Sequence, residues 1–175
     1  MSNETSHRRL ELVGTAPARV APDDSPHRDA YVGEIWIARP DEGPDVLVLV
    51  TDLADDHVQA LLSTDDDGIA TETDAVLAPR ITGYSGRLLV HGDVAGSILR
   101  RRLTRSVGRV DPEIARRIVL RGCGMDFNSQ DLGRGRPILD ESDPRWQAKL
   151  ERVERLRTVK ARASELGLKI TALRP

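Results

Sequence analysis

The sequence predicts a mainly β protein with some α structure: a small antiparallel barrel or half-open sheet, followed by a long C-terminal helix. Short apolar runs separated by turn-forming residues fill the first two-thirds of the chain. The first helix signal comes only after these runs, and this order favours an antiparallel sheet over alternating strands and helices. An amphipathic stretch of about 23 residues near the C-terminus predicts the long helix.

The composition fits one globular domain with polar ends. The chain has 175 residues, of which 39% are hydrophobic and only 3% aromatic, so we expect an aliphatic core. No stretch approaches the roughly 20 apolar residues that span a bilayer. The N-terminus also lacks the apolar core of a secretory signal. We therefore expect a cytoplasmic protein that does not contact a membrane.

Cysteine and histidine usage gives no sign of a metal site. Cys123 is the only cysteine, which excludes an intramolecular disulfide and leaves one thiol as a candidate ligand. The four histidines are scattered without the spacing of metal ligands. The acidic turn at residues 64–74 contains DDDG but lacks the distal Glu of a calcium loop. We predict no metal and no cofactor.

Charge is distributed unevenly along the chain. Residues 1–97 contain 18 acidic and 7 basic residues, whereas residues 98–175 contain 10 acidic and 19 basic residues. The net charges of the two parts are therefore −11 and +9. A basic half attracts nucleic acid or an acidic partner, and neutralisation of one half by the other within one fold is the alternative.

The chain divides into four segments. Residues 1–28 are polar and rich in turn formers, which predicts a flexible N-terminal arm. The barrel is expected over residues 29–121 and a Gly-rich linker over residues 122–141. Residues 142–175 are expected to form the C-terminal amphipathic helix and its tail.

Strands are expected throughout the barrel segment. Residues 31–38 alternate between apolar and polar, while residues 45–51 form the nearly continuous apolar run of a strand buried on both faces. Further strands are predicted over residues 57–63 and 75–81. Residues 88–90 predict a strand that stops at HGD, residues 91–93, and the alternation resumes over residues 103–110.

A short helix is expected directly after these strands. The DPE sequence at residues 111–113 is a helix start, because Asp caps free amide hydrogens and Pro needs no donor at the first position. Ile114 and Ile118 then give one apolar stripe, and the helix is expected to end near Arg121 and Gly122.

Five arginines form the best electrostatic site for nucleic acid: Arg100, Arg101, Arg102, Arg105 and Arg109. On a regular strand, Arg101, Arg105 and Arg109 share one face, which suits a row that follows the phosphates of RNA or DNA. The alternative is an exposed strand face that neutralises the acidic half of the chain.

The C-terminal helix is predicted to begin at SDP, residues 142–144, and to end near Gly167. At about 23 residues it reaches roughly 35 Å, too long for a small barrel to cover. We therefore expect a partner protein or a second copy of the chain to contact its apolar residues, Trp146, Leu150, Val153 and Leu156. Nucleic-acid contact through the arginines of this helix is the alternative, which the interleaved glutamates weaken.

Four short motifs together resemble the MazF/PemK-like family of toxin-antitoxin ribonucleases. They are GEIW at residues 33–36, the apolar strand at residues 46–50, LLST at residues 61–64, and RLTRSVGRVDPEIARRI at residues 102–118. The resemblance implies an SH3-like barrel that dimerises. It also implies that single-stranded RNA binds in a groove at the dimer interface, and that an antitoxin peptide inhibits by occupying the same groove.

The resemblance further implies an endoribonuclease that needs no metal, with an Arg before the second strand paired with a Thr or Ser that ends the third. Attack by a ribose 2'-hydroxyl requires proton transfers and positive charge beside the phosphorane. Ser63 or Thr64 stands at the hydroxyl position. At the Arg position residues 41–46 read DEGPDV, with acid in place of base.

The sequence therefore favours nucleic-acid binding, with RNA as the expected ligand, ahead of cleavage. The alternative is a non-catalytic protein-interaction subunit of a larger bacterial assembly. Such a subunit would hold its partner through the barrel groove and the C-terminal helix.

Overall fold

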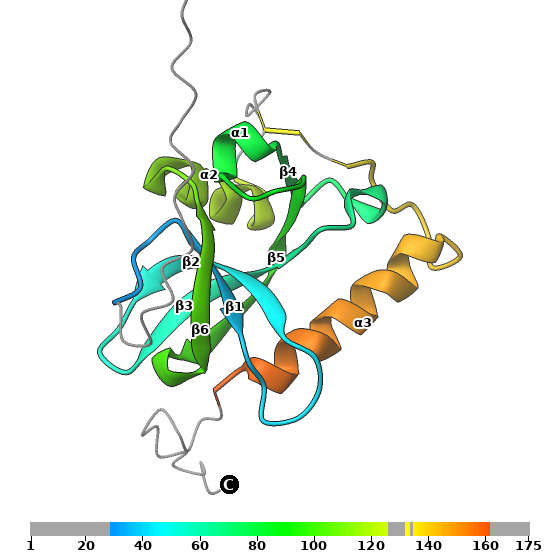
Figure 1. Ribbon diagram of the computed structural model, residues 1–175. Coiled ribbons are helices and arrows are strands. Elements are labelled where there is room, and N and C mark those ends of the chain that lie inside the picture. Colours follow the sequence, from blue (N-terminus) through cyan, green and yellow to red (C-terminus); the bar gives the residue numbers. More distant parts are fainter. Residues whose placement is uncertain (1–28, 126–131, 134, 162–175) are drawn as a thin grey trace, which may run out of the picture.

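The computed structural model describes residues 29–125, 132–133 and 135–161. The predicted N-terminal arm and the end of the C-terminal tail lie outside these residues. The described chain forms one antiparallel sheet, with a helix packed on each of its two faces (Figure 1). No helix in the described part is long and apolar enough to cross a membrane.

Six strands make up the sheet: β1 (Glu34–Ala38), β2 (Val46–Leu53), β3 (His57–Thr64), β4 (Ala75–Leu77), β5 (Leu88–Leu99) and β6 (Leu103–Arg109). Their spatial order is β4-β5-β3-β2-β1-β6, and each neighbouring pair is antiparallel. β4 and β6 are the edges, and no pairing joins them among the described residues. The sheet is therefore not closed into a barrel. Of the two predicted forms, barrel and half-open sheet, the structure shows the half-open sheet.

A short helix, α1 (Pro79–Thr82), takes the place of the second half of the strand predicted over residues 75–81. Pro79 has no amide hydrogen for strand pairing and suits the first helical position instead. α1 then packs against β6, where a Cβ on Gly108 would lie 2.6 Å from the Thr82 carbonyl oxygen. α1, which lies between β4 and β5 in the sequence, thus contacts β6 at the opposite edge of the sheet without forming strand pairing with it.

The predicted helix after the sheet is confirmed as α2 (Pro112–Gly122). The Asp111 carboxylate accepts a hydrogen bond from the Glu113 amide at 2.8 Å, which satisfies one of the free donors at the helix start. Ala115 and Ile118 are buried against the sheet. Two single-turn 3-10 helices complete the elements, η1 (Asp67–Ile69) and η2 (Arg100–Arg102).

The C-terminal helix, α3 (Pro144–Val159), begins where the sequence predicts but is shorter. The Asp143 side chain caps it by accepting from the Arg145 amide at 2.9 Å. It has 16 residues, or about 24 Å, because Lys160 leaves the helix in an extended conformation. The amide of Ala161 instead donates to the Ser97 carbonyl of β5 at 2.7 Å. The predicted continuation to Gly167 is wrong at residues 160 and 161.

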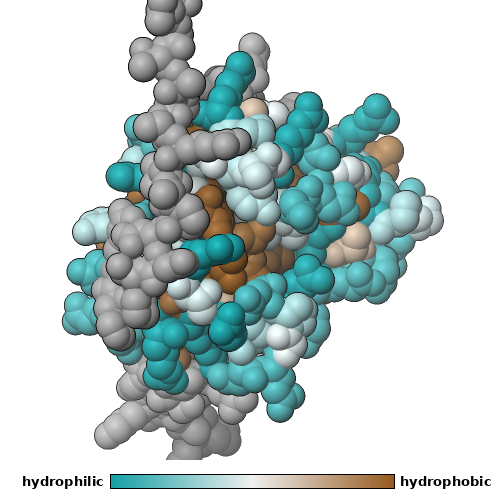
Figure 2. All heavy atoms as spheres, viewed as in Figure 1, coloured by the Kyte–Doolittle hydropathy of each residue, from teal (hydrophilic) through white to brown (hydrophobic). Residues whose placement is uncertain are grey.

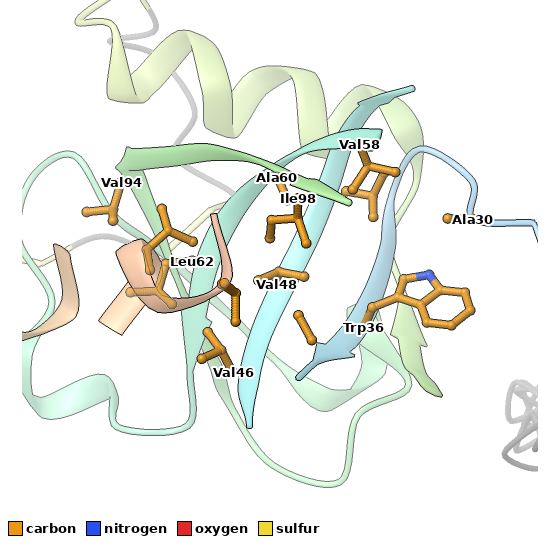
Figure 3. Close-up of a cluster of buried hydrophobic side chains, with 13 residues drawn as sticks. Ala30, Trp36, Val46, Val48, Val58, Ala60, Leu62, Val94 and Ile98 are labelled. Carbon is orange, nitrogen blue, oxygen red and sulfur yellow. The ribbon is translucent and has the colours of Figure 1, made fainter. Parts of the chain in front are cut away.

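Two hydrophobic clusters lie on the two faces of the sheet. The first joins β1, β2, β3 and β5 to Leu156 and Val159 of α3. Figure 3 shows Val48, Leu62 and Ile98 of this cluster gathered over the strands. The second joins the other face to α2. It is incompletely covered, since Leu47, Ile81 and Val107 are only partly buried. Figure 2 shows apolar side chains at the centre of the viewed surface, surrounded by hydrophilic ones.

Candidate functional site

The two hydroxyl residues predicted as catalytic end β3, and they face opposite sides of the sheet. Ser63 is paired with Leu47 and Val90, which belong to the cluster under α2. Thr64 is the next residue, so its side chain lies on the face that α3 covers. Both residues are buried, with exposed fractions of 2% for Ser63 and 9% for Thr64. One site therefore cannot use both hydroxyls.

The Ser63 hydroxyl has no hydrogen-bond partner among the described residues. An unsatisfied buried hydroxyl costs about 1–3 kcal/mol, because it loses its water without a replacement. Its neighbours across the sheet are apolar. Among the described residues, Ser63 thus has no hydrogen-bonded group that would take or supply a proton.

Thr64 belongs to a chain of three polar side chains, which we call the Thr64/His91/Asp74 relay. The Thr64 Oγ1 lies 3.4 Å from His91 Nε2, and His91 Nδ1 lies 3.2 Å from Asp74 Oδ1. The second Asp74 oxygen accepts from the amide of Thr71 at 2.8 Å and from its hydroxyl at 3.0 Å. His91 and Asp74 are each only 1% exposed.

Asp74 is the ionised end of the relay. Burial, the largest single influence, raises the pKa of Asp74, but the hydrogen bond and charge of His91 and the Thr71 donors together lower it below its ordinary value. In neutral His91 the ionised carboxylate holds the hydrogen on Nδ1. The Nε2 atom is then the acceptor that faces the Thr64 hydroxyl.

His91 and Asp74 are site residues that the sequence did not single out. The HGD sequence was expected to end a strand, yet β5 continues through it to Leu99. Gly92 makes this possible, because any Cβ there would lie 2.3 Å from the Thr73 carbonyl oxygen. His91 comes 17 positions after Asp74 and 27 positions after Thr64 in the sequence, yet the three side chains meet in the relay. No local pattern marks such a meeting, since strand pairing produces it.

The arginines predicted to share one face do not do so. Arg109 is paired with Glu34 of β1, and Arg105 is paired with Ile37. Glu34 and Ile37 are three residues apart, so their side chains face opposite sides of the sheet. Each cross-strand partner lies on the same side as the residue it pairs with, which places Arg109 and Arg105 on opposite sides. The prediction fails because β6 carries an extra residue at a register shift opposite residues 35 and 36.

Two of the five arginines instead hold the fold together. Arg102 is 8% exposed, and its guanidinium donates to Asp41 Oδ2 at 2.7 Å and to the carbonyl oxygens of Val159 and Lys160 at 2.9 and 3.2 Å. It thereby ends α3 by binding its last carbonyls. Arg100 donates to the Ala54 carbonyl oxygen at 2.9 and 3.1 Å.

The acidic loop between β1 and β2 has a structural explanation. Asp41 is the ion-pair partner of Arg102, and Asp45 binds Arg39 with 3.1 Å between Nε and Oδ1. Two acids of this loop, Asp41 and Asp45, are thus engaged by arginines of this chain.

A group of exposed arginines remains along β6, and we call it the arginine edge: Arg80, Arg101, Arg105 and Arg109. Arg80 belongs to it because α1 packs against β6. In the part of the chain that the structure describes, Arg80, Arg105 and Arg109 have no hydrogen-bond or ion-pair partner. Among the described residues, Arg80, Arg105 and Arg109 therefore leave unneutralised positive charge at this edge, on both faces of β6.

The four predicted partner-binding residues of α3 fall into two groups. Leu156 is 3% exposed and Val153 packs on the hydrophobic cluster, so neither is available to a partner. Trp146 and Leu150 are 37% and 48% exposed. The difference arises because the second half of α3 lies on the sheet, where Leu156 approaches Gly96.

The fold and the site define a half-open antiparallel sheet protein with a buried Thr-His-Asp relay and a cationic edge. Its sequence matches no protein-family model and no curated protein. Among solved structures, it is similar to the Mycobacterium tuberculosis toxin MazF-mt6, at 19% sequence identity and a TM-score of 0.42. The match covers 54% of this chain and 99% of that chain.

Proposed function

We propose that this protein binds single-stranded nucleic acid, with RNA as the expected ligand, through the arginine edge. The observation that carries the proposal is the exposure of Arg105, Arg109 and Arg80 without acidic partners among the described residues. By contrast, Arg87 and Arg157, elsewhere on the surface, are paired with Asp67 and Glu154. Unneutralised arginines gain most from phosphate, because their binding releases counterions from the nucleic acid.

The motif resemblance to the MazF/PemK-like family supports RNA over DNA and belongs to the same proposal. With it come a relationship to toxin-antitoxin proteins, a homodimer in the cytoplasm, and an antitoxin peptide as a partner. The sequence motifs that carry this resemblance all lie in the sheet and in α2.

The geometry supports binding ahead of cleavage by the family's pairing of Arg and Thr. Arg39 is the arginine of the loop between β1 and β2, and Asp45 neutralises it. The pKa of Arg39 is raised by its hydrogen bond to Asp45 and by the charge of that carboxylate. Ser63 has no proton-transfer partner in the described structure. Among the described residues, these contacts therefore give no support to a pairing of Arg39 with Ser63.

Fluorescence anisotropy with a labelled single-stranded RNA tests the proposal. The affinity should fall with salt, by roughly 0.7 in log K per log unit of salt for each phosphate contacted. Arg105→Glu combined with Arg109→Glu should abolish binding. Arg155→Glu combined with Arg157→Glu, with the same charge change on α3, should leave it intact. Equal losses in both double variants would contradict a site at the arginine edge.

A second candidate function, protein interaction through α3, is favoured by the exposure of Trp146 and Leu150. The two side chains are four residues apart, so they form one apolar patch on the outer side of the helix. If the patch joins two copies, sedimentation should show a dimer that Leu150→Glu converts to a monomer. A wild-type monomer at high concentration would exclude the second copy as the partner.

A further inference from the structure

The arginine edge lies close to the point where the N-terminal arm joins the fold. Asp29 is the first described residue, and its carboxylate oxygen Oδ1 lies 3.7 Å from Arg100 Nη1. The next residue, Ala30, is 4% exposed and packs in the same cluster as Trp36 of β1 (Figure 3). Leu103, the first residue of β6, packs on that cluster too. The arm therefore enters the fold near the start of β6.

The arm carries two adjacent acids near its end. Residues 20–28 read VAPDDSPHR, in which Asp23 and Asp24 stand six and five residues before Asp29. A chain of that length spans at most roughly 20 Å when it is extended. β6 is 7 residues long, so its edge extends over about 20 Å as well. The two carboxylates can therefore reach the arginine edge along its length.

The charge at the edge favours an acidic occupant. Arg80, Arg105 and Arg109 have no hydrogen-bond or ion-pair partner among the described residues. A second copy that paired with β6 would bring arginines against arginines, and charged side chains of this kind protect edge strands from pairing. A pair of carboxylates meets the opposite charge instead. A tethered segment of the same chain also stays at an effective concentration on the order of millimolar.

We propose that the acidic end of the N-terminal arm, centred on Asp23 and Asp24, binds the arginine edge and competes there with RNA. The proposal rests on the proposed RNA binding. Ion pairs between exposed side chains are weak, so the arm occupies the edge only part of the time. RNA displaces the arm because it presents a row of phosphates and releases counterions when it binds. The arm thus excludes ligands with few negative charges and admits polyanions.

Fluorescence anisotropy with the full chain and a labelled single-stranded RNA measures the competition. The double variant Asp23→Asn with Asp24→Asn removes two charges from the arm, and its affinity for RNA should be roughly 3- to 10-fold higher at low salt. The control variant, Glu4→Gln with Glu11→Gln, makes the same charge change farther from the fold and should bind as the wild type does. The gain should shrink as salt rises, because salt screens exposed charges.

A second measurement detects the contact without RNA. In NMR spectra of the full chain, the side-chain Nε–Hε signals of Arg105 and Arg109 report the groups that bind these arginines. The signals should shift in the Asp23/Asp24 double variant and keep their wild-type positions in the control variant. Dilution should leave the wild-type signals in place, because a contact within one chain does not depend on concentration.

The outcomes distinguish this proposal from the one on which it rests. Equal RNA affinity for the wild type and the Asp23/Asp24 double variant would overturn the competition and leave RNA binding in place. An equal gain in the control variant would reveal a general effect of charge and would overturn it too. Arginine signals that move on dilution would place the arm on another copy, against a contact within one chain. If no variant binds RNA, the proposed function fails, and unshifted arginine signals in the double variant would separately overturn the contact.

Discussion

Replacing Ser63 by alanine is expected to stabilise the protein. The Ser63 hydroxyl is buried, with 2% of the residue exposed, and has no hydrogen-bond partner among the described residues. Alanine keeps the Cβ and removes only the oxygen, so the desolvation cost of that oxygen is recovered. This cost is about 1–3 kcal/mol, and the small void left behind offsets part of it. We expect the free energy of unfolding to rise by about 1 kcal/mol.

Urea denaturation followed by circular dichroism measures the effect. The midpoint of Ser63→Ala should move to higher urea without a change in slope. Thr64→Val is the matched comparison, one residue away on the other face. It leaves His91 Nε2 without its partner and should lower stability by about 1 kcal/mol. A lower midpoint for Ser63→Ala would show that the hydroxyl has a partner in solution, and the reasoning would then be wrong.

Three further perturbations follow from the contacts. Arg102→Met should lower the free energy of unfolding by about 2–3 kcal/mol in urea denaturation, because it removes the donors that hold the end of α3. Gly108→Ala should cost about 1–3 kcal/mol, since its Cβ would lie 2.6 Å from a carbonyl oxygen of α1, whereas Gly86→Ala should be tolerated in the same assay. The lowered pKa of Asp74 means that its contribution to stability is present above about pH 4 and is lost as pH falls below it. Acid titrations of stability should therefore be shallower for Asp74→Asn than for the wild type.

Local sequence patterns correctly predicted the elements that are determined by residues close together in the sequence. The apolar run of β2 and the cap of α2 at Asp111 are where the sequence predicts them. Each depends on neighbouring residues, through the period of side chains on a strand or the donors freed at a helix start. The predicted start of α3 at Asp143 is correct for the same reason.

Element ends and shared faces were predicted less well, because contacts between distant segments decide them. α3 ends where the guanidinium of Arg102 takes its last carbonyls, 57 residues away in sequence. Arg105 and Arg109 lost their common face through a register shift that appears only when β6 pairs with β1. Periodicity within one segment carries no information about either contact.

The sequence by itself determined that the chain forms an antiparallel sheet with helices at its end, and that Ser63 and Thr64 close one strand. Only the tertiary structure decided which hydroxyl belongs to a polar site. Alternation along β3 places the two side chains on opposite faces, but strand pairing and the approach at Gly92 bring His91 and Asp74 to Thr64 alone. Side-chain alternation is a local property of the backbone, whereas the partners across a sheet depend on its register and on the packing of the whole fold.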